Sequence, residues 1–216
     1  MNQAPVAARS RRSDAGQVRV TERDLRLLRI VGEQYAITLP QLARLMGRSH
    51  HAARWLRERW QAAGWVEARA LLVGRPVFLW LTRRGLRAAG LDYAVWRPAA
   101  GALAHVAAVT EVRLHVEARH ERAVWVSERD LGGEAVRCGA HRPDGLVRLD
   151  GRESAVEVEL TLKERRRAAR IMGELVGGYA AVSYFAAPAP WRLISDLADE
   201  LGAGRVQVLA LPEGDR

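Results

Sequence analysis

The sequence holds one cysteine and one lysine among its 216 residues, and no apolar stretch in it is long enough to cross a bilayer. The single thiol, Cys138, rules out an internal disulfide and fits a reducing compartment. The first twenty residues carry four arginines but no hydrophobic stretch, so they do not resemble a secretion signal. These absences exclude a membrane partner and predict a cytoplasmic protein.

Positive charge is unevenly distributed along the chain, whose formal net charge is +9. Residues 1–100 hold 18 arginines and 7 acidic residues, whereas the remainder holds 16 basic and 18 acidic ones. A high-arginine genome explains 33 arginines beside one lysine, but it does not explain why the positive excess ends near residue 100. Because a basic domain gains affinity for a polyanion by releasing condensed counterions, this half predicts a double-stranded DNA partner.

Three short helices are predicted near the start of the basic half. The segments Thr21–Asp24 and Thr38–Gln41 both have the form of a capping box, and each precedes apolar residues at helical spacing. The first helix is expected to end near Tyr35 and the second at Gly47. A third helix should then extend over residues 49–63.

The third helix has two different sides. Ala53, Leu56 and Trp60 recur on the inner side, while basic and hydrogen-bonding residues occupy the outer one. A short helix, a glycine turn and a second helix of this kind make a helix-turn-helix, which favours DNA contact through the outer side. The residues expected to contact DNA from this helix are Ser49, His50, His51, Arg54 and Arg57. His50 and His51 are equally consistent with surface positions at a helix start.

Two strands around a turn are predicted next, over residues 66–72 and 77–81. Arg69 and Arg75 are the expected DNA contacts here, with Arg75 at the tip within reach of phosphate or the minor groove. Trp65 and Trp80 are expected to pack against the third helix. This order resembles a winged helix, common in bacterial DNA-binding regulators, over residues 19–91. The resemblance implies DNA binding, with a protein-docking role as the alternative.

The remaining organisation follows from composition and periodicity. Residues 1–18 are expected to form a disordered basic arm and residues 92–102, which contain Pro98 and Gly101, a linker. From residue 103 to 216 the pattern predicts helix, three strands, helix, strand, helix and strand, an α/β sheet with helices on its faces. A capping box at Thr161–Glu164 should open the middle helix. The whole chain is therefore expected to be α+β.

Acidic residues gather on two neighbouring strands of this second half. Asp144 follows a proline, and Glu157 and Glu159 alternate with Val156 and Val158, so both glutamates should lie opposite the core. The pattern resembles the PD-(D/E)XK nuclease-like fold, whose acidic residues hold a divalent metal and orient water. The resemblance implies Asp144, Glu157 and Glu159 as metal ligands and Mg²⁺ as the cofactor.

The sequence departs from that motif at the lysine position, where Glu159 stands. A carboxylate cannot stabilise an anionic transition state as an ammonium can, so catalysis is put in doubt. Lys163, expected in the first turn of the following helix, is the candidate to supply the charge. An active site would then use Asp144, Glu157, Glu159 and Lys163. The alternative, which we favour, is that Lys163 and Arg165–Arg167 form a solvated face or a phosphate contact.

A winged helix followed by this sheet, with the stretches PDGLVRL and VEVELTLK, resembles the plasmid replication-relaxation family of actinobacterial and related mobile elements. The resemblance implies a DNA-binding protein in plasmid or mobile-element replication, relaxation or transfer, with replication or transfer proteins as partners and a degenerate nuclease-like domain. A homodimer is expected. Two alternatives stay open: a metal-dependent endonuclease or nickase, and a winged-helix transcription regulator whose second domain senses a ligand or partner.

A zinc site is the weakest of the predicted centres. Cys138 and His141 have zinc-like spacing, and His115 and His120 are further candidate ligands. Structural zinc usually takes four ligands with thiolates prominent, so a single cysteine argues against it.

Overall fold

The computed structural model describes residues 20–71, 73–131, 141–202 and 204–214. The chain contains both helices and strands, and the strands form two separate sheets. The expected α+β class is therefore confirmed. The basic arm expected over residues 1–18 lies outside the described residues, as does Cys138. Among the described helices, none combines the length and apolar character needed to cross a membrane.

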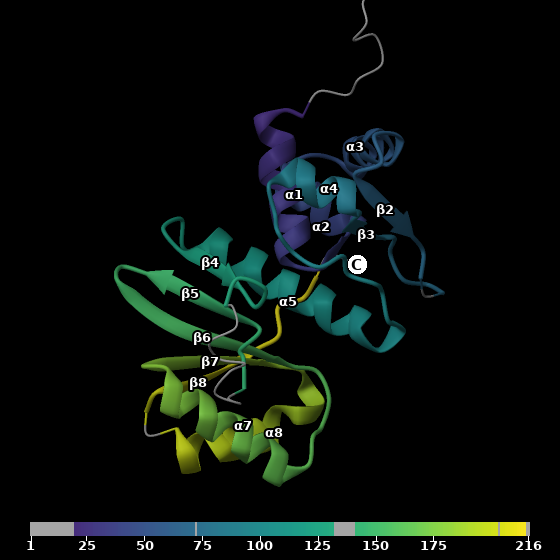
Figure 1. The fold of residues 1–216 in the computed structure, drawn as a ribbon. Coiled ribbons are helices and arrows are strands. Elements are labelled where there is room, and N and C mark those ends of the chain that lie inside the picture. The colour runs from purple at the N-terminus through teal and green to yellow at the C-terminus, as the bar shows by residue number, and fades with distance from the viewer. Residues whose placement is uncertain (1–19, 72, 132–140, 203, 215–216) are drawn as a thin grey trace, which may run out of the picture.

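The first half folds as four helices around a small antiparallel sheet (Figure 1). The strand order is β1-β3-β2, and both pairings are antiparallel. The helices are α1 (Glu22–Glu33), α2 (Leu39–Met46), α3 (His50–Ala62) and α4 (Arg83–Ala89). The strands are β1 (Ala36–Thr38), β2 (Val66–Arg69) and β3 (Phe78–Leu81). The three-residue β1, which the sequence pattern did not predict, adds the third strand.

The helix starts follow from their capping residues. Thr21 and Thr38 each accept a hydrogen bond from the third helical residue, whose side chain accepts one in return, so both expected capping boxes are present. Gly47 ends α2 with a φ of 57°, a left-handed conformation that a residue without a Cβ adopts at little cost. Ser49 then caps α3 through its side chain. These local signals place α3 directly after α2.

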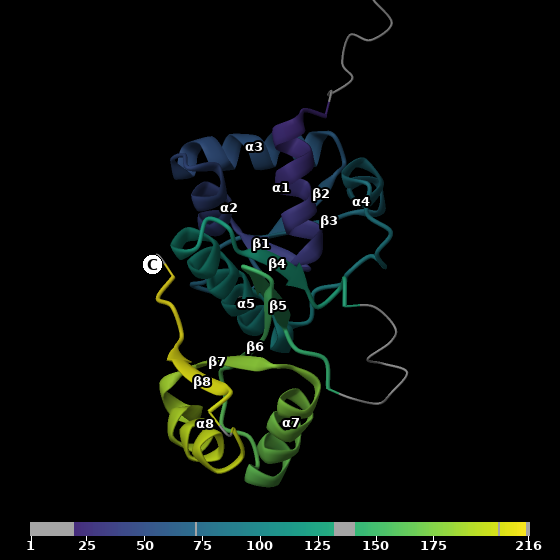
Figure 2. The ribbon, with the colours of Figure 1, turned by 90° about the vertical axis from the view of Figure 1, so that its left-hand side faces the viewer.

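The second half is a five-stranded sheet with helices on both faces (Figure 2). The strand order is β4-β5-β6-β7-β8, with antiparallel pairing from β4 to β6 and parallel pairing from β6 to β8. The strands are β4 (Val124–Ser127), β5 (Gly145–Leu149), β6 (Arg152–Glu159), β7 (Ala181–Ala186) and β8 (Val206–Ala210). The helices are α5 (Ala100–Arg119), α7 (Arg165–Gly178) and α8 (Pro188–Leu201).

Alternation along the strands divides the core of this half into two layers. Val156, Val158 and Phe185 pack against α5 on one face of the sheet. Ala155 and Tyr184 face the other way and pack with the apolar sides of α7 and α8. Glu157 and Glu159, which alternate with the two valines, lie on the opposite face from them, as expected. That face is covered by α7 and α8 and is itself core, so the glutamates are buried and do not lie away from the core.

Helix α5 joins the two halves because it packs against both sheets (Figure 1). Leu103 and Val106 cluster with Trp80 of β3 on one side, while other residues of α5 cover the five-stranded sheet. Trp80 thus packs against α5 rather than α3, which corrects the expectation for it. Trp65 lies in the core of the first half together with Leu56 and Trp60 of α3.

The helix after β6 begins later than its sequence suggests. Helix α7 begins at Arg165. Its N-cap residue, Glu164, makes no capping hydrogen bond with its side chain. The capping box expected at Thr161–Glu164 is therefore wrong. The physical reason is that Lys163 pairs with Glu159 at the end of β6, which keeps this segment outside the helix.

Candidate functional site

The three predicted acidic residues lie close together at one end of β5 and β6. Glu157 and Glu159 are buried, with exposed fractions of 3% and 4%. The antiparallel register pairs Gly145 with Val156, so Asp144 stands opposite Glu157 just before β5 begins. The structure therefore brings these carboxylates from neighbouring strands to one place, which we call the acidic cluster.

Asp144 is held by two donors. His105 of α5 donates from Nε2 to Oδ1 at 2.8 Å, and the backbone N–H of Val158 donates to Oδ2 at 2.7 Å. The hydrogen bond with Asp144 raises the pKa of His105 above its usual value, although burial opposes it. Both oxygens of this carboxylate thus already have a partner within the chain.

Glu157 is paired with a histidine from the segment before β5. Nε2 of His141 lies 2.9 and 3.0 Å from the two carboxylate oxygens, and the backbone N–H of His141 donates to Glu174 of α7 at 2.7 Å. Burial and the nearby Asp144 raise the pKa of Glu157 to about 7. The hydrogen bond with Glu157 raises the pKa of His141. The pair therefore holds a proton more tightly than either isolated side chain would.

Glu159 is neutralised by the only lysine of the chain. Lys163 forms an ion pair with its carboxylate from four residues further along. The backbone N–H of Thr161 donates to the same carboxylate at 3.4 Å. Lys163 reaches the acidic cluster, but it does so from the loop before α7 rather than from the first turn of that helix.

The acidic cluster does not fit a shared divalent-metal centre. A metal requires carboxylate oxygens that converge on one open point, whereas Asp144, Glu157 and Glu159 are each engaged by a separate cationic or N–H donor. Within residues 20–71, 73–131, 141–202 and 204–214, no group of three or more His, Cys, Asp or Glu side chains is arranged to hold a metal ion. In this arrangement each carboxylate of the acidic cluster is paired with a histidine or lysine side chain.

The predicted nucleic-acid residues of α3 lie on one exposed face. His50, His51 and Arg54 are exposed, and so is Trp55, with 60% of its surface accessible. Ser49 is exposed but uses its hydroxyl to accept from the Ala52 N–H at 3.3 Å. Arg54 forms no ion pair with any residue that the structure describes. This face is therefore open to a ligand.

Arg57 and the hairpin arginines Arg69 and Arg75 differ in exposure and in whether they form an ion pair. Arg57 is only half-buried and pairs with Glu58 at 2.7 Å. Arg69 on β2 is exposed and pairs with Glu67 at 3.3 Å. Arg75 is exposed in the turn between β2 and β3, next to Gly74. Of these three, only Arg75 forms no ion pair with another described residue.

Sequence reasoning missed the two histidines that complete the acidic cluster. His141 lies three residues before Asp144, and its proximity to the Pro-Asp pair was the available signal. His105 comes from a helix almost forty residues away, and nothing local marks it. Of the candidate zinc ligands, Cys138 lies outside the described residues and His141 is paired with Glu157. His115 instead packs edge-on against the ring of Phe185, with centroids 6.4 Å apart.

Comparisons with protein-family models, with curated proteins and with solved structures found no match for this chain.

Proposed function

We propose that this chain is a double-stranded DNA-binding protein whose first half is a winged helix. The proposal rests on one observation: the outer face of α3 exposes His51, Arg54 and Trp55, and the hairpin beside it exposes Arg75. In this arrangement α3 enters the major groove, where a guanidinium can donate two hydrogen bonds to guanine. Arg75 contacts the backbone or the minor groove.

Two further properties support this function. The first hundred residues carry the positive excess of the chain, which favours phosphate contact. Asp24 and Trp60 tie α3 to α1, so the helix is held rigidly by its inner side while its outer side stays exposed. From the resemblance of the sequence to the plasmid replication-relaxation family, we propose a role in plasmid or mobile-element replication, relaxation or transfer.

A gel mobility-shift series tests the DNA contacts. The probe is a duplex selected by the wild-type protein from a random library, and the competitor is unselected duplex. Arg54→Ala should reduce discrimination between the two by about 1–3 kcal/mol. Arg75→Ala should weaken both complexes equally and make the salt dependence of log K shallower by about 0.9.

Arg192→Ala is the matched control, because Arg192 is an exposed arginine of α8 in the other half of the molecule. It removes the same charge and should leave both complexes unchanged. If the Arg54→Ala and Arg75→Ala variants both bind duplex with wild-type affinity, this mode of binding is contradicted.

We propose further that the second half is a nuclease-like domain without catalytic activity. The carboxylates of Asp144, Glu157 and Glu159 are neutralised by His105, His141 and Lys163. The endonuclease alternative draws on the same observation, since these residues do gather at one place. Supercoiled plasmid incubated with Mg²⁺ or Mn²⁺ should remain supercoiled. Nicking that disappears in Asp144→Ala would overturn this assignment, whereas nicking unchanged by it would come from a contaminant.

A further inference from the structure

A broad trough lies on the part of the five-stranded sheet that α5 leaves uncovered. α7 and α8 both pack on the opposite face, while α5 covers mainly β4 and β6 (Figure 2). The trough has a volume of about 950 Å³, and residues of β5, β6, β7 and β8 line it together with the end of α5. Parallel strands normally carry helices on both faces, so an open surface over β7 and β8 is unusual.

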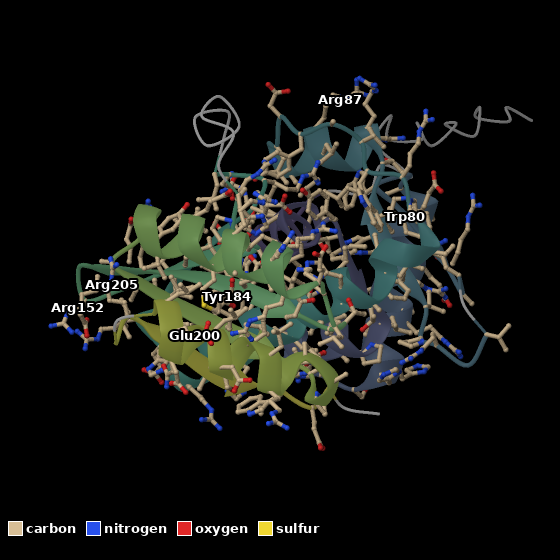
Figure 3. All side chains as sticks on the ribbon, turned by 90° about the horizontal axis from the view of Figure 1, so that it is seen from below. Trp80, Arg87, Arg152, Tyr184, Glu200 and Arg205 are labelled. Atoms are coloured by element: carbon tan, nitrogen blue, oxygen red, sulfur yellow. The ribbon has the colours of Figure 1, made fainter. Side chains whose placement is uncertain are left out.

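Unneutralised positive charge surrounds this trough. Arg119 from α5, Arg152 from β6 and Arg205 before β8 all line it and are exposed. None of the three forms an ion pair with another residue in the described part of the chain. Arg152 on β6 and Arg205 before β8 both lie at the same end of the sheet, with β7 between their strands (Figure 3). Glu153 also lines the trough, but Arg148 neutralises it at 2.5 Å.

The floor of the trough is polar in the middle and apolar at one end. Ser154 and Ser183 place their hydroxyl oxygens 3.2 Å apart, and Gln207 is exposed on the neighbouring strand, in register with Ser183. Phe185 and His115 lie toward α5, ring edge against ring face. The floor therefore offers hydroxyl and amide groups for hydrogen bonding beside the partly exposed ring of His115, which packs on the buried Phe185.

We propose that this trough binds a single strand of nucleic acid. The arginines are placed to contact phosphates, and the serine hydroxyls and the Gln207 amide can hydrogen-bond sugars and base edges. A flexible strand can enter the concave surface. A duplex is a rigid cylinder with its phosphates outside and would touch only the rim. An amphipathic helix of a protein would instead press apolar side chains onto the Gln207 amide and cover the three arginines, which a nucleic-acid strand can pair with its phosphates.

This site is separate from the outer face of α3 and does not depend on duplex binding there. Burial and the nearby Arg119 lower the pKa of His115, so it is a neutral group at pH 7. The attraction for phosphate therefore comes from the three arginines and not from this histidine.

Fluorescence anisotropy with a labelled oligothymidylate of about 16 nucleotides tests the proposal, since single-strand sites of this type span roughly 4–16 nucleotides. The double variant Arg152→Ala/Arg205→Ala should bind about tenfold more weakly. Its plot of log K against log salt should be shallower by about 1.4, the value for two lost phosphate contacts on a single strand. Both side chains are exposed and form no ion pair with another described residue, so the fold should be unaffected, as a wild-type thermal midpoint would verify.

The control is Arg87→Ala/Arg192→Ala, which removes two exposed arginines outside the trough and leaves the net charge equal to that of the test variant. It should bind the oligothymidylate as the wild type does. If both double variants lose the same affinity for the oligothymidylate, the effect comes from net charge alone and the proposal is overturned. No binding by the wild type, or loss of single-strand binding in Arg54→Ala, would also overturn it. If the wild type binds the oligothymidylate but does not bind duplex, the α3 contact is contradicted and this site is left standing.

Discussion

Asp24 accepts a hydrogen bond from the indole N–H of Trp60 at 2.9 Å, and this contact joins the start of α1 to the end of α3. The same carboxylate accepts from the backbone and hydroxyl of Thr21 and pairs with Arg59. Burial raises the pKa of Asp24, but these hydrogen bonds and the guanidinium outweigh it and lower the pKa below its usual value. One capping residue thus also fixes the orientation of α3.

Asp24→Ala should lower the free energy of unfolding by about 3 kcal/mol, because it removes a cap and leaves the buried indole N–H of Trp60 without an acceptor. Urea denaturation measures this change. Asp92→Ala, which removes an exposed carboxylate from the same half, should change the value by less than about 0.5 kcal/mol. Equal effects of the two substitutions would show that Asp24 does not anchor α3.

Gly85 of α4 lies against the backbone of Trp65. A Cβ at this position would meet the carbonyl oxygen of Trp65 at 1.9 Å, so Gly85→Ala must push α4 away from Trp65, the residue before β2. The expected loss is about 1–3 kcal/mol of unfolding free energy. Gly173→Ala is the matched control in α7, where a Cβ meets nothing within 4 Å. It should stabilise the chain by about 0.5–1 kcal/mol. A neutral Gly85→Ala in thermal denaturation would refute the close approach.

Arg129 links the two halves of the molecule. Its guanidinium lies over the rings of Tyr35 and Tyr93, 4.7 and 4.2 Å from their centroids, and donates to the carbonyl of Gly32 at 2.6 Å. Arg129→Ala should cost about 2 kcal/mol of unfolding free energy and increase proteolysis between the halves. Arg122→Ala removes an exposed arginine that pairs with Asp150 at the surface, and it should cost less than about 1 kcal/mol. If Arg129→Ala and Arg122→Ala lower the free energy of unfolding equally, Arg129 does not link the two halves.

The Glu157–His141 pair predicts how stability depends on pH. Because the pKa of Glu157 in the folded chain is about 7, above its usual 4.5, the folded state keeps a proton that the unfolded state has lost. The contribution of this group is therefore lost as pH rises from about 4.5 to 7. The raised pKa of His141 acts with the same sign, from its usual 6.5 upward.

Unfolding free energies of wild type and Glu157→Gln at pH 5, 6, 7 and 8 should test this dependence. The stability of wild type relative to the variant should fall steadily across the series. Glu164→Gln, at an exposed carboxylate before α7, should run parallel to wild type. A constant difference between wild type and Glu157→Gln would remove the argument for a tightly held proton.

Local chemistry accounts for the elements that could be predicted from the sequence. The capping boxes at Thr21 and Thr38, the glycine at position 47 and the alternation from Val156 to Glu159 each involve residues within four positions of one another. Interactions this short depend only on neighbouring residues of the chain. The order of elements other than β1, the exposed side of α3 and the shared face of Glu157 and Glu159 could therefore be predicted.

Only the tertiary structure decided which partners those residues take. Trp80 packs toward α5, and Lys163 pairs with Glu159 outside the expected helix. His105 reaches the acidic cluster from a distant helix, and His141 reaches Glu157 from the segment before β5. A carboxylate buried in a low-dielectric interior requires a hydrogen-bond donor or a positive charge beside it. Which residue provides it depends on the packing of distant segments. The sequence by itself thus determined where the acidic and basic groups lie along the chain, and packing determined that the acids are neutralised while the arginines of the trough are left exposed.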